Sequence, residues 1–138
     1  MMISTRARYA LRVMIDLAEH CGEGYIPMKD VAARQEISLK YLEKILPVLT
    51  KKDMIEGVHG KGGGYRLTRG AAEYRVGEII RITEGDLAPV ACLNCEATPC
   101  GRTADCRTFP MWKKFYEMVN EYFDGITIAD LMRDNLPD

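Results

Sequence analysis

Four of the five cysteines lie close together in the sequence, at Cys92, Cys95, Cys100 and Cys106. Gaps of two, four and five residues separate them, and Leu93 is the only large apolar residue between them. A polar loop has no packing reason to carry four thiols. Thiolates bind iron–sulfur clusters and zinc, and two thiols can also act as a redox pair. The segment is therefore expected to be a sensor or a metal-stabilised loop.

The bulk composition is that of an ordinary globular protein. The 138 residues are 47% hydrophobic and 28% charged, which suits about one domain. The sequence contains no apolar run of about 18 residues, so no transmembrane helix is expected, and the N-terminus lacks the apolar run of a secretory signal. We therefore expect a cytoplasmic protein, in which clustered cysteines bind metal more often than they form disulfides.

Charge is divided unevenly along the chain. Residues 1–75 carry 13 Lys and Arg against 9 Asp and Glu, whereas residues 76–138 carry 6 against 11. A basic first half and an acidic second half suit a protein that places one end on a polyanion, although chance variation gives the same pattern.

Hydrophobic periodicity predicts a mainly α-helical chain with one small β-hairpin. The predicted helices, with a kink expected at Pro47 in the third, cover 4–20, 28–35, a stretch after Ser38, 76–84, 108–123 and a short stretch after Thr127. The predicted strands cover 54–59 and 65–68, and a very short one covers 25–27. Residues 1–75 are then a winged helix-turn-helix domain. Residues 76–138 are dimerisation helices with a cysteine loop at about 86–108.

Cap residues and apolar spacing sharpen these predictions. Ser4 or Thr5, Ser38 and Thr108 are placed to cap helices, and Thr127-x-x-Asp130 resembles a capping box. The third helix is expected to bury five aliphatic residues: Leu39, Leu42, Ile45, Leu46 and Leu49. The helix over 108–123 carries an apolar seam for a dimer or for packing within the chain: Trp112, Phe115, Val119, Tyr122 and Ile126.

Two short helices, a tight turn and a glycine hairpin form a winged helix-turn-helix pattern. The second helix of such a pair reads bases in the major groove with its N-terminal residues. Here these are Ser38, Lys40, Tyr41, Glu43 and Lys44. The lysines can reach phosphates or guanine edges. Glu43 can accept a hydrogen bond from a cytosine amine, or it can be a surface residue that pairs with Lys40 or with the helix.

The glycine hairpin is expected to be the wing. His59 and Lys61 lie beside Gly62 and Gly63, whose bare backbone lets the tip approach a minor groove closely, and Arg66 lies just beyond. Arg6, Arg8 and Arg12 on the first helix can add phosphate contacts or be solvated surface. An enzyme is not expected, because neither histidine has a nucleophile or carboxylate arranged beside it in the sequence.

These segments resemble the IscR/CymR/NsrR-type winged-helix transcriptional regulators, the Rrf2 family. The matching stretches are residues 4–10, 37–43, 60–65, 77–80 and 126–131. The resemblance implies a homodimeric repressor or activator that binds double-stranded DNA, with the dimer built on the helix over 108–123. We expect a repressor whose affinity depends on the cysteine loop.

The resemblance also bears on the cofactor. In iron–sulfur members, three loop cysteines bind a [2Fe–2S] cluster with a His, Asp or Glu as fourth ligand. Cys100 and Cys106 match the last two cysteines by their spacing before Trp112, and Cys92 or Cys95 matches the first.

The non-cysteine positions depart from the family pattern. Phe109 occupies the position of the histidine ligand in one branch, and Arg8 occupies that of an aspartate ligand in another. His59 occupies the wing position at which the family usually carries an arginine. A cluster would then take four thiolates, or three thiolates with Glu96, Asp105 or a residue of a partner subunit.

Other occupants of the loop remain open. The cysteine spacing is close to a zinc knuckle, which would make the loop a structural zinc site. The loop can also carry no metal, with control by thiol oxidation or by a bound metabolic enzyme, as in the cysteine-metabolism branch. An electron carrier is the remaining rival, and it leaves the basic helix and the glycine wing unexplained.

Overall fold

The computed structural model describes residues 2–94 and 100–133. The α-helices are α1 (Thr5–Glu19), α2 (Met28–Gln35), α3 (Leu39–Lys51), α4 (Val76–Glu84), α5 (Phe109–Asp124) and α6 (Ile128–Leu131). The strands are β1 (Ile55–Val58) and β2 (Gly64–Leu67). Short 3-10 turns are η1 (Cys21–Glu23), η2 (Ala71–Glu73) and η3 (Ala91–Leu93). The prediction of a mainly α-helical chain with one hairpin is confirmed.

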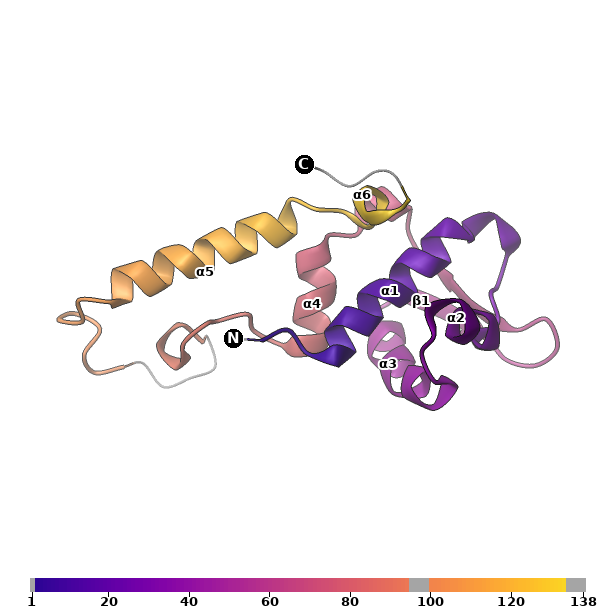
Figure 1. Cartoon of the computed structure of the whole chain (residues 1–138), viewed down its shortest axis with the longest axis horizontal. Coiled ribbons are helices and arrows are strands. Elements are labelled where there is room, and N and C mark those ends of the chain that lie inside the picture. Colours follow the sequence, from indigo (N-terminus) through magenta and orange to yellow (C-terminus); the bar gives the residue numbers. More distant parts are fainter. Residues whose placement is uncertain (1, 95–99, 134–138) are drawn as a thin grey trace.

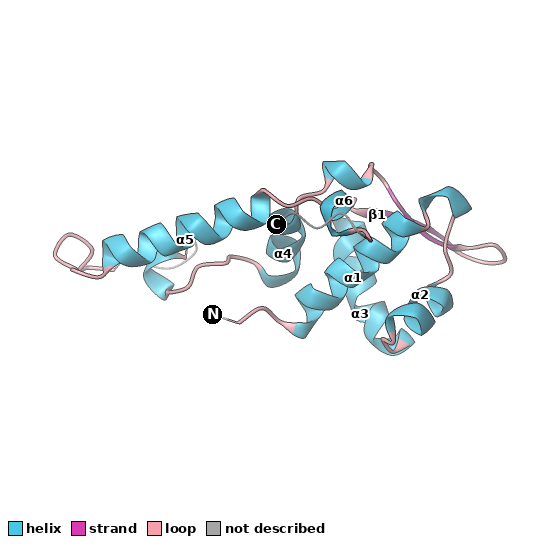
Figure 2. Cartoon of the chain, turned by 45° about the horizontal axis from the view of Figure 1, so that its top comes forward, coloured by secondary structure: helices cyan, strands magenta, loops and turns pink. Residues whose placement is uncertain are grey.

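The chain has a packed head and an extended arm. Figure 1 shows α1, α2, α3 and the hairpin gathered at one end, with α4 beside them and α5 reaching away toward the other end. The described part of the cysteine loop lies near the far end of α5, and the tip of the hairpin lies at the other end of the molecule. Figure 2 shows the same separation from a second direction.

The head is built on one hydrophobic core. Its members come from α1, α2, α3, β1 and the later helices, and include Met14, Val31, Leu42, Ile79 and Ile128. Ile79 and Ile128 show that α4 and α6 contribute to the same core as the first half of the chain. α1 begins where Ser4 accepts a hydrogen bond from the N–H of Ala7 at 3.1 Å, which confirms the predicted cap.

The turn between α2 and α3 is tight. Glu36 ends α2 in the left-handed conformation at φ 54°, and the N–H of Ile37 bonds back to the carbonyl of Ala32. Ser38 then caps α3 through the N–H of Tyr41 at 3.1 Å, as predicted. α3 continues through Pro47 to Lys51. The expectation that Leu39 is buried was wrong, because it lies at the open first turn, before the helix reaches the core.

The hairpin consists of two antiparallel strands, and one residue of a third segment bridges to it. β1 and β2 pair from Ile55 opposite Leu67 to Val58 opposite Gly64. Ile26 extends this sheet by one bridge, exchanging two backbone hydrogen bonds of 2.9 Å with Tyr65. The predicted short strand at 25–27 is therefore a single bridge that fixes the hairpin to the loop before α2.

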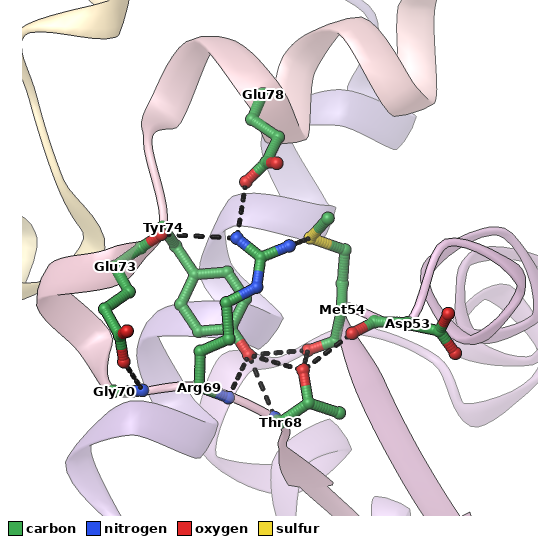
Figure 3. Close-up of polar contacts among 8 residues, drawn as sticks. All are labelled: Asp53, Met54, Thr68, Arg69, Gly70, Glu73, Tyr74 and Glu78. Atoms are coloured by element: carbon green, nitrogen blue, oxygen red, sulfur yellow. Dashed lines mark hydrogen bonds and ion pairs between the residues drawn. The ribbon is translucent and has the colours of Figure 1, made fainter.

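A buried tyrosine joins the base of the hairpin to α4 (Figure 3). The hydroxyl of Tyr74 accepts hydrogen bonds from the N–H groups of Thr68 and Arg69 at 2.9 and 3.0 Å, and donates to the carbonyl of Met54 at 2.8 Å. The guanidinium of Arg69 lies over the Tyr74 ring and pairs with Glu78 of α4 at 3.0 Å. The base of the hairpin, where β1 begins and β2 ends, is thus tied to the start of α4.

The arm carries its apolar side chains on two faces. Val119, Phe123 and Ile126 pack with Val76 and Ile80 of α4 in a second small core. Phe115 and Tyr122 of the predicted seam are exposed instead. The seam therefore divides between packing within the chain and an open face.

Of the two helix caps predicted in the second half of the chain, one is present and the other is not. The capping box of Thr127 and Asp130 is confirmed, with hydrogen bonds of 2.8 and 3.1 Å. Thr108 precedes α5 but its side chain forms no capping hydrogen bond to the helix. In residues 2–94 and 100–133, none of the helices combines the length and apolar character needed to cross a membrane.

Candidate nucleic-acid interface and cysteine loop

The first two turns of α3 present the predicted base-reading residues to solvent. Ser38, Lys40, Glu43 and Lys44 are all exposed, while Leu42 on the opposite side is buried in the core. Among the described residues, neither lysine forms an ion pair with Glu43, so the predicted surface pairing of Glu43 with Lys40 is not present. Two cations and one carboxylate are thus available to an incoming ligand.

Tyr41 is held in place by α1. Its ring meets that of Tyr9 edge-on at 5.3 Å between centroids, and Arg12 lies over the ring of Tyr9 at 5.2 Å. Arg12 also donates to the side chain and the backbone carbonyl of Gln35 at the end of α2. Tyr9 and Arg12 therefore fix the start of α3 against both α1 and α2, and Arg12 is engaged within the protein.

Glycines shape the wing for backbone reasons. Gly60 and Gly62 have φ of 92° and 77°, values that residues with a side chain rarely adopt. A Cβ at Gly63 would overlap the carbonyl oxygen of Val58, and one at Gly64 would overlap that of Ile26. The run of glycines is therefore required by the hairpin itself and by the bridge at Ile26.

The predicted wing cations differ in how far they are engaged by other side chains. His59 and Lys61 are exposed at the tip, on either side of Gly60. Arg66 pairs with Glu56 across the hairpin at 2.6 Å and stacks over Tyr25 at 4.4 Å. The tip is thus open to a ligand, whereas Arg66 stiffens the base of the wing.

The two remaining first-helix arginines lie near the start of α1. Arg6 donates to the carbonyl of Thr83, at the end of α4, at 2.6 Å. Arg8 donates to the hydroxyl of Thr5 at 3.0 Å and is otherwise exposed. Of the two, Arg8 is the more available to a phosphate.

A buried carboxylate locks α1 to α2. Asp16 is 2% exposed and accepts hydrogen bonds from Arg34 at 2.7 and 3.0 Å and from Gln35 at 2.9 Å. Burial raises the pKa of Asp16, but the hydrogen bonds and the charge of Arg34 outweigh it, so the pKa lies below the usual value for aspartate. No local pattern in the sequence predicts this network, because its members are 18 and 19 residues apart.

The cysteine loop is open and leads into α5. Cys100 is exposed, and Cys92 in η3 and Cys106 before α5 are half-buried. The hydroxyl of Thr108 lies 3.5 Å from the sulfur of Cys106. Hydrogen bonds from the side chain and backbone of Thr108 lower the pKa of Cys106, which favours the thiolate.

The donor set fits a soft metal in its chemistry. Thiolates are the form that binds iron–sulfur clusters and zinc, and Cys106 is biased toward that form. The described residues contain no ready-made group of three or more His, Cys, Asp or Glu ligands. Cys95 and Glu96 lie outside the described residues. A site would therefore need Cys95 or a closer approach of the three described loop cysteines.

The open face of α5 is a continuous apolar surface. It consists of Met111, Phe115, Met118 and Tyr122, all exposed, with Met118 and Tyr122 at 56% and 66%. These residues follow one another at steps of four, three and four, so they share one side of the helix. Four large apolar side chains on one open side mark a surface suited to a partner.

Comparisons with known proteins agree with this geometry. Residues 3–134 match the family Rrf2, described as iron-dependent transcriptional regulator. The protein rrf2 of Nitratidesulfovibrio vulgaris is 40% identical over 134 residues, covering 97% of this chain and 89% of that protein.

Two solved structures share the whole fold. IscR of T. potens has a TM-score of 0.74 at 35% identity, covering 97% of this chain and 88% of that one. CymR of B. subtilis, described as its global cysteine regulator, has a TM-score of 0.78 at 33% identity, covering 95% of both chains. These relatives are regulators rather than enzymes, as expected. The chain therefore belongs to the Rrf2 family of winged-helix transcriptional regulators.

Proposed function

We propose that this chain is a homodimeric, sequence-specific repressor whose affinity for double-stranded DNA is set by the state of its cysteine loop. The observation that best supports DNA reading is the exposed start of α3, which presents Lys40, Glu43 and Lys44 without ion pairs among the described residues. In a winged helix-turn-helix this end of the second helix enters the major groove. The basic tip of the wing at His59 and Lys61 then lies ready for the neighbouring minor groove.

Direct contacts are assigned to the residues predicted from the sequence. Ser38, Lys40, Tyr41, Glu43 and Lys44 would face the major groove. In the wing, Lys61 would supply charge, His59 would offer a ring N–H to the DNA, and Gly62 and Gly63 would allow close approach. Arg6 and Arg8 would face phosphates at the edge of the site, with Arg6 needing to release Thr83 first.

The proposed dimer would allow the protein to read two DNA half-sites. We assign its interface to the open face of α5, because that face is apolar and lies on the arm, away from the reading head (Figure 1). A dimer presents two reading heads to two half-sites, whose spacing follows from the geometry of the arms.

The cysteine loop is the proposed input. A cluster, the leading candidate, would be held by Cys106, Cys100 and Cys92, with Cys95 as the fourth thiolate. Thiol oxidation of the same residues is the second candidate, favoured by the hydrogen bonds from Thr108 that lower the pKa of Cys106. A red-brown colour and iron in the anaerobically purified protein would support the cluster. A colourless protein with stoichiometric zinc would support a structural knuckle instead.

DNA reading by α3 is tested by the salt dependence of binding. We expect a Lys40→Ala, Lys44→Ala double variant to bind mixed-sequence duplex DNA more weakly, and its log–log salt slope to flatten by about 0.9 for each phosphate that the variant no longer neutralises. The matched control removes two exposed lysines of α5, Lys113 and Lys114. Equal slopes in the two double variants would reject α3 as the reading helix.

A further inference from the structure

Leu39 occupies the first position of α3, directly after the Ser38 cap. Its side chain is 45% exposed, whereas Leu42, Leu46 and Leu49 of the same helix are buried. A single exposed leucine is ordinary on a protein surface. The position of Leu39 suggests a role in DNA recognition, because the first turn of a recognition helix comes closest to the edges of the bases.

Leu39 and Glu43 lie on the same side of α3, one turn apart. The other exposed members of the helix are Lys40, Lys44, Pro47, Thr50 and Lys51. All thirteen residues of α3 are described, and Leu39 is the one exposed large aliphatic side chain among them. Its apolar surface therefore stands beside the carboxylate rather than within the row of lysines.

Only thymine displays a methyl group in the major groove, and apolar side chains recognise that group by contact. We infer that Leu39 contacts the C5-methyl group of a thymine next to the base that Glu43 reads. The inference rests on the proposed function, since it requires α3 to lie in the major groove. Leu39 then determines specificity at one position of each half-site, by a contact that no lysine of the helix supplies.

The test removes the methyl group without altering base pairing. A binding site is first selected from a random duplex library with the full-length protein, and each thymine of the site is then replaced singly by deoxyuridine. We expect one replacement per half-site to weaken binding about fourfold, the factor that corresponds to burial of one methyl group. In the Leu39→Ala variant the same replacement should have no further effect.

Val58→Ala is the matched control. Val58 is 46% exposed on β1, close to the wing tip. The wing faces the minor groove, which displays no thymine methyl, so this variant should keep the full response to deoxyuridine. Equal thermal unfolding of Leu39→Ala and the parent protein would show that the head remains folded.

Two outcomes would overturn the inference while leaving DNA reading intact. One is normal site selection with no response to any deoxyuridine. The other is a response that Leu39→Ala retains in full. Failure to enrich any site from the library would instead count against the proposed function, and the inference would fall with it.

Discussion

Glu84, at the end of α4, accepts a hydrogen bond from the N–H of Ser4 at 2.5 Å and so joins α4 to the start of α1. Arg6 strengthens this joint through the carbonyl of Thr83. Two residues beyond Glu84, Asp86 accepts a hydrogen bond from Tyr116 of α5 at 2.5 Å. The segment that enters the cysteine loop is therefore attached to the packed head on one side and to the arm on the other.

This joint predicts an effect of Glu84→Ala. Removal of a hydrogen bond worth about 1 kcal/mol should speed hydrogen exchange of the Ala7 and Arg8 amides, which bond to Ser4, roughly fivefold. The variant should also show a smaller change in DNA affinity between the two states of the loop. Glu117→Ala, at an exposed position of α5, is the control and should change neither measurement. Unaltered exchange in α1 would show that the joint does not restrain the helix.

Tyr74→Phe should destabilise the head. The variant leaves the N–H groups of Thr68 and Arg69 and the carbonyl of Met54 without the hydroxyl that satisfies them. The hydrogen bond to Met54 is buried and the two from the N–H groups are partly buried. Buried polar groups left unpaired cost about 1–3 kcal/mol, so the free energy of unfolding in urea should fall by that order. Tyr25→Phe should have little effect, because the described residues form no hydrogen bond with the Tyr25 hydroxyl and Tyr25 lies outside the proposed dimer interface. Equal destabilisation by the two variants would contradict a special role for the Tyr74 hydroxyl.

Asp16 predicts a stability that depends on acid pH. Because its pKa is lowered in the folded protein, its contribution is present above the unfolded-state pKa of about 3.9 and is lost as the pH falls through the folded pKa. Asp16→Asn should therefore lower the unfolding free energy at pH 7, and the gap to the parent protein should narrow below about pH 4. A gap that stays constant from pH 7 to pH 3 would exclude this linkage.

The open face of α5 predicts an assembly defect. Met118→Glu places a charge in the centre of the proposed interface, and an unpaired charge there should weaken dimerisation at least tenfold. Sedimentation equilibrium measures this directly. Lys113→Glu also introduces a glutamate on α5 but outside the apolar face, so it should remain dimeric. A dimeric Met118→Glu variant would place the interface elsewhere.

Local signals in the sequence predicted most of the fold. The Ser38 cap, the Thr127 capping box and the helices predicted over 4–20 and 76–84 each depend on residues within one or two turns, and all were confirmed. The expectation for Leu39 was wrong because spacing places a residue on a face but does not say where the core begins. The predicted apolar seam of α5 likewise divides between two faces of the helix. α4 covers only the part that contains Val119 and Ile126, and the spacing does not show how far that cover extends.

Long-range partners could not be predicted from the sequence. Arg12 was expected to be able to reach phosphate, but it bonds to Gln35, 23 residues away. Asp16 with Arg34, and Tyr74 with Met54, are also brought together only by the packing of the head. The sequence did indicate the exposed lysines of α3, because a charged residue opposite a buried leucine needs no knowledge of tertiary contacts.

The most direct measurement is the affinity of the protein for its selected DNA site before and after treatment of its thiols. It uses protein prepared under nitrogen and then exposed to a thiol oxidant, in a Cys21→Ser background so that only the loop responds. We expect at least a tenfold change in Kd, and no change when Cys100 and Cys106 are also replaced by serine. Identical Kd values before and after oxidation, in a protein that still binds its site, would contradict control of DNA binding by the thiols of the cysteine loop.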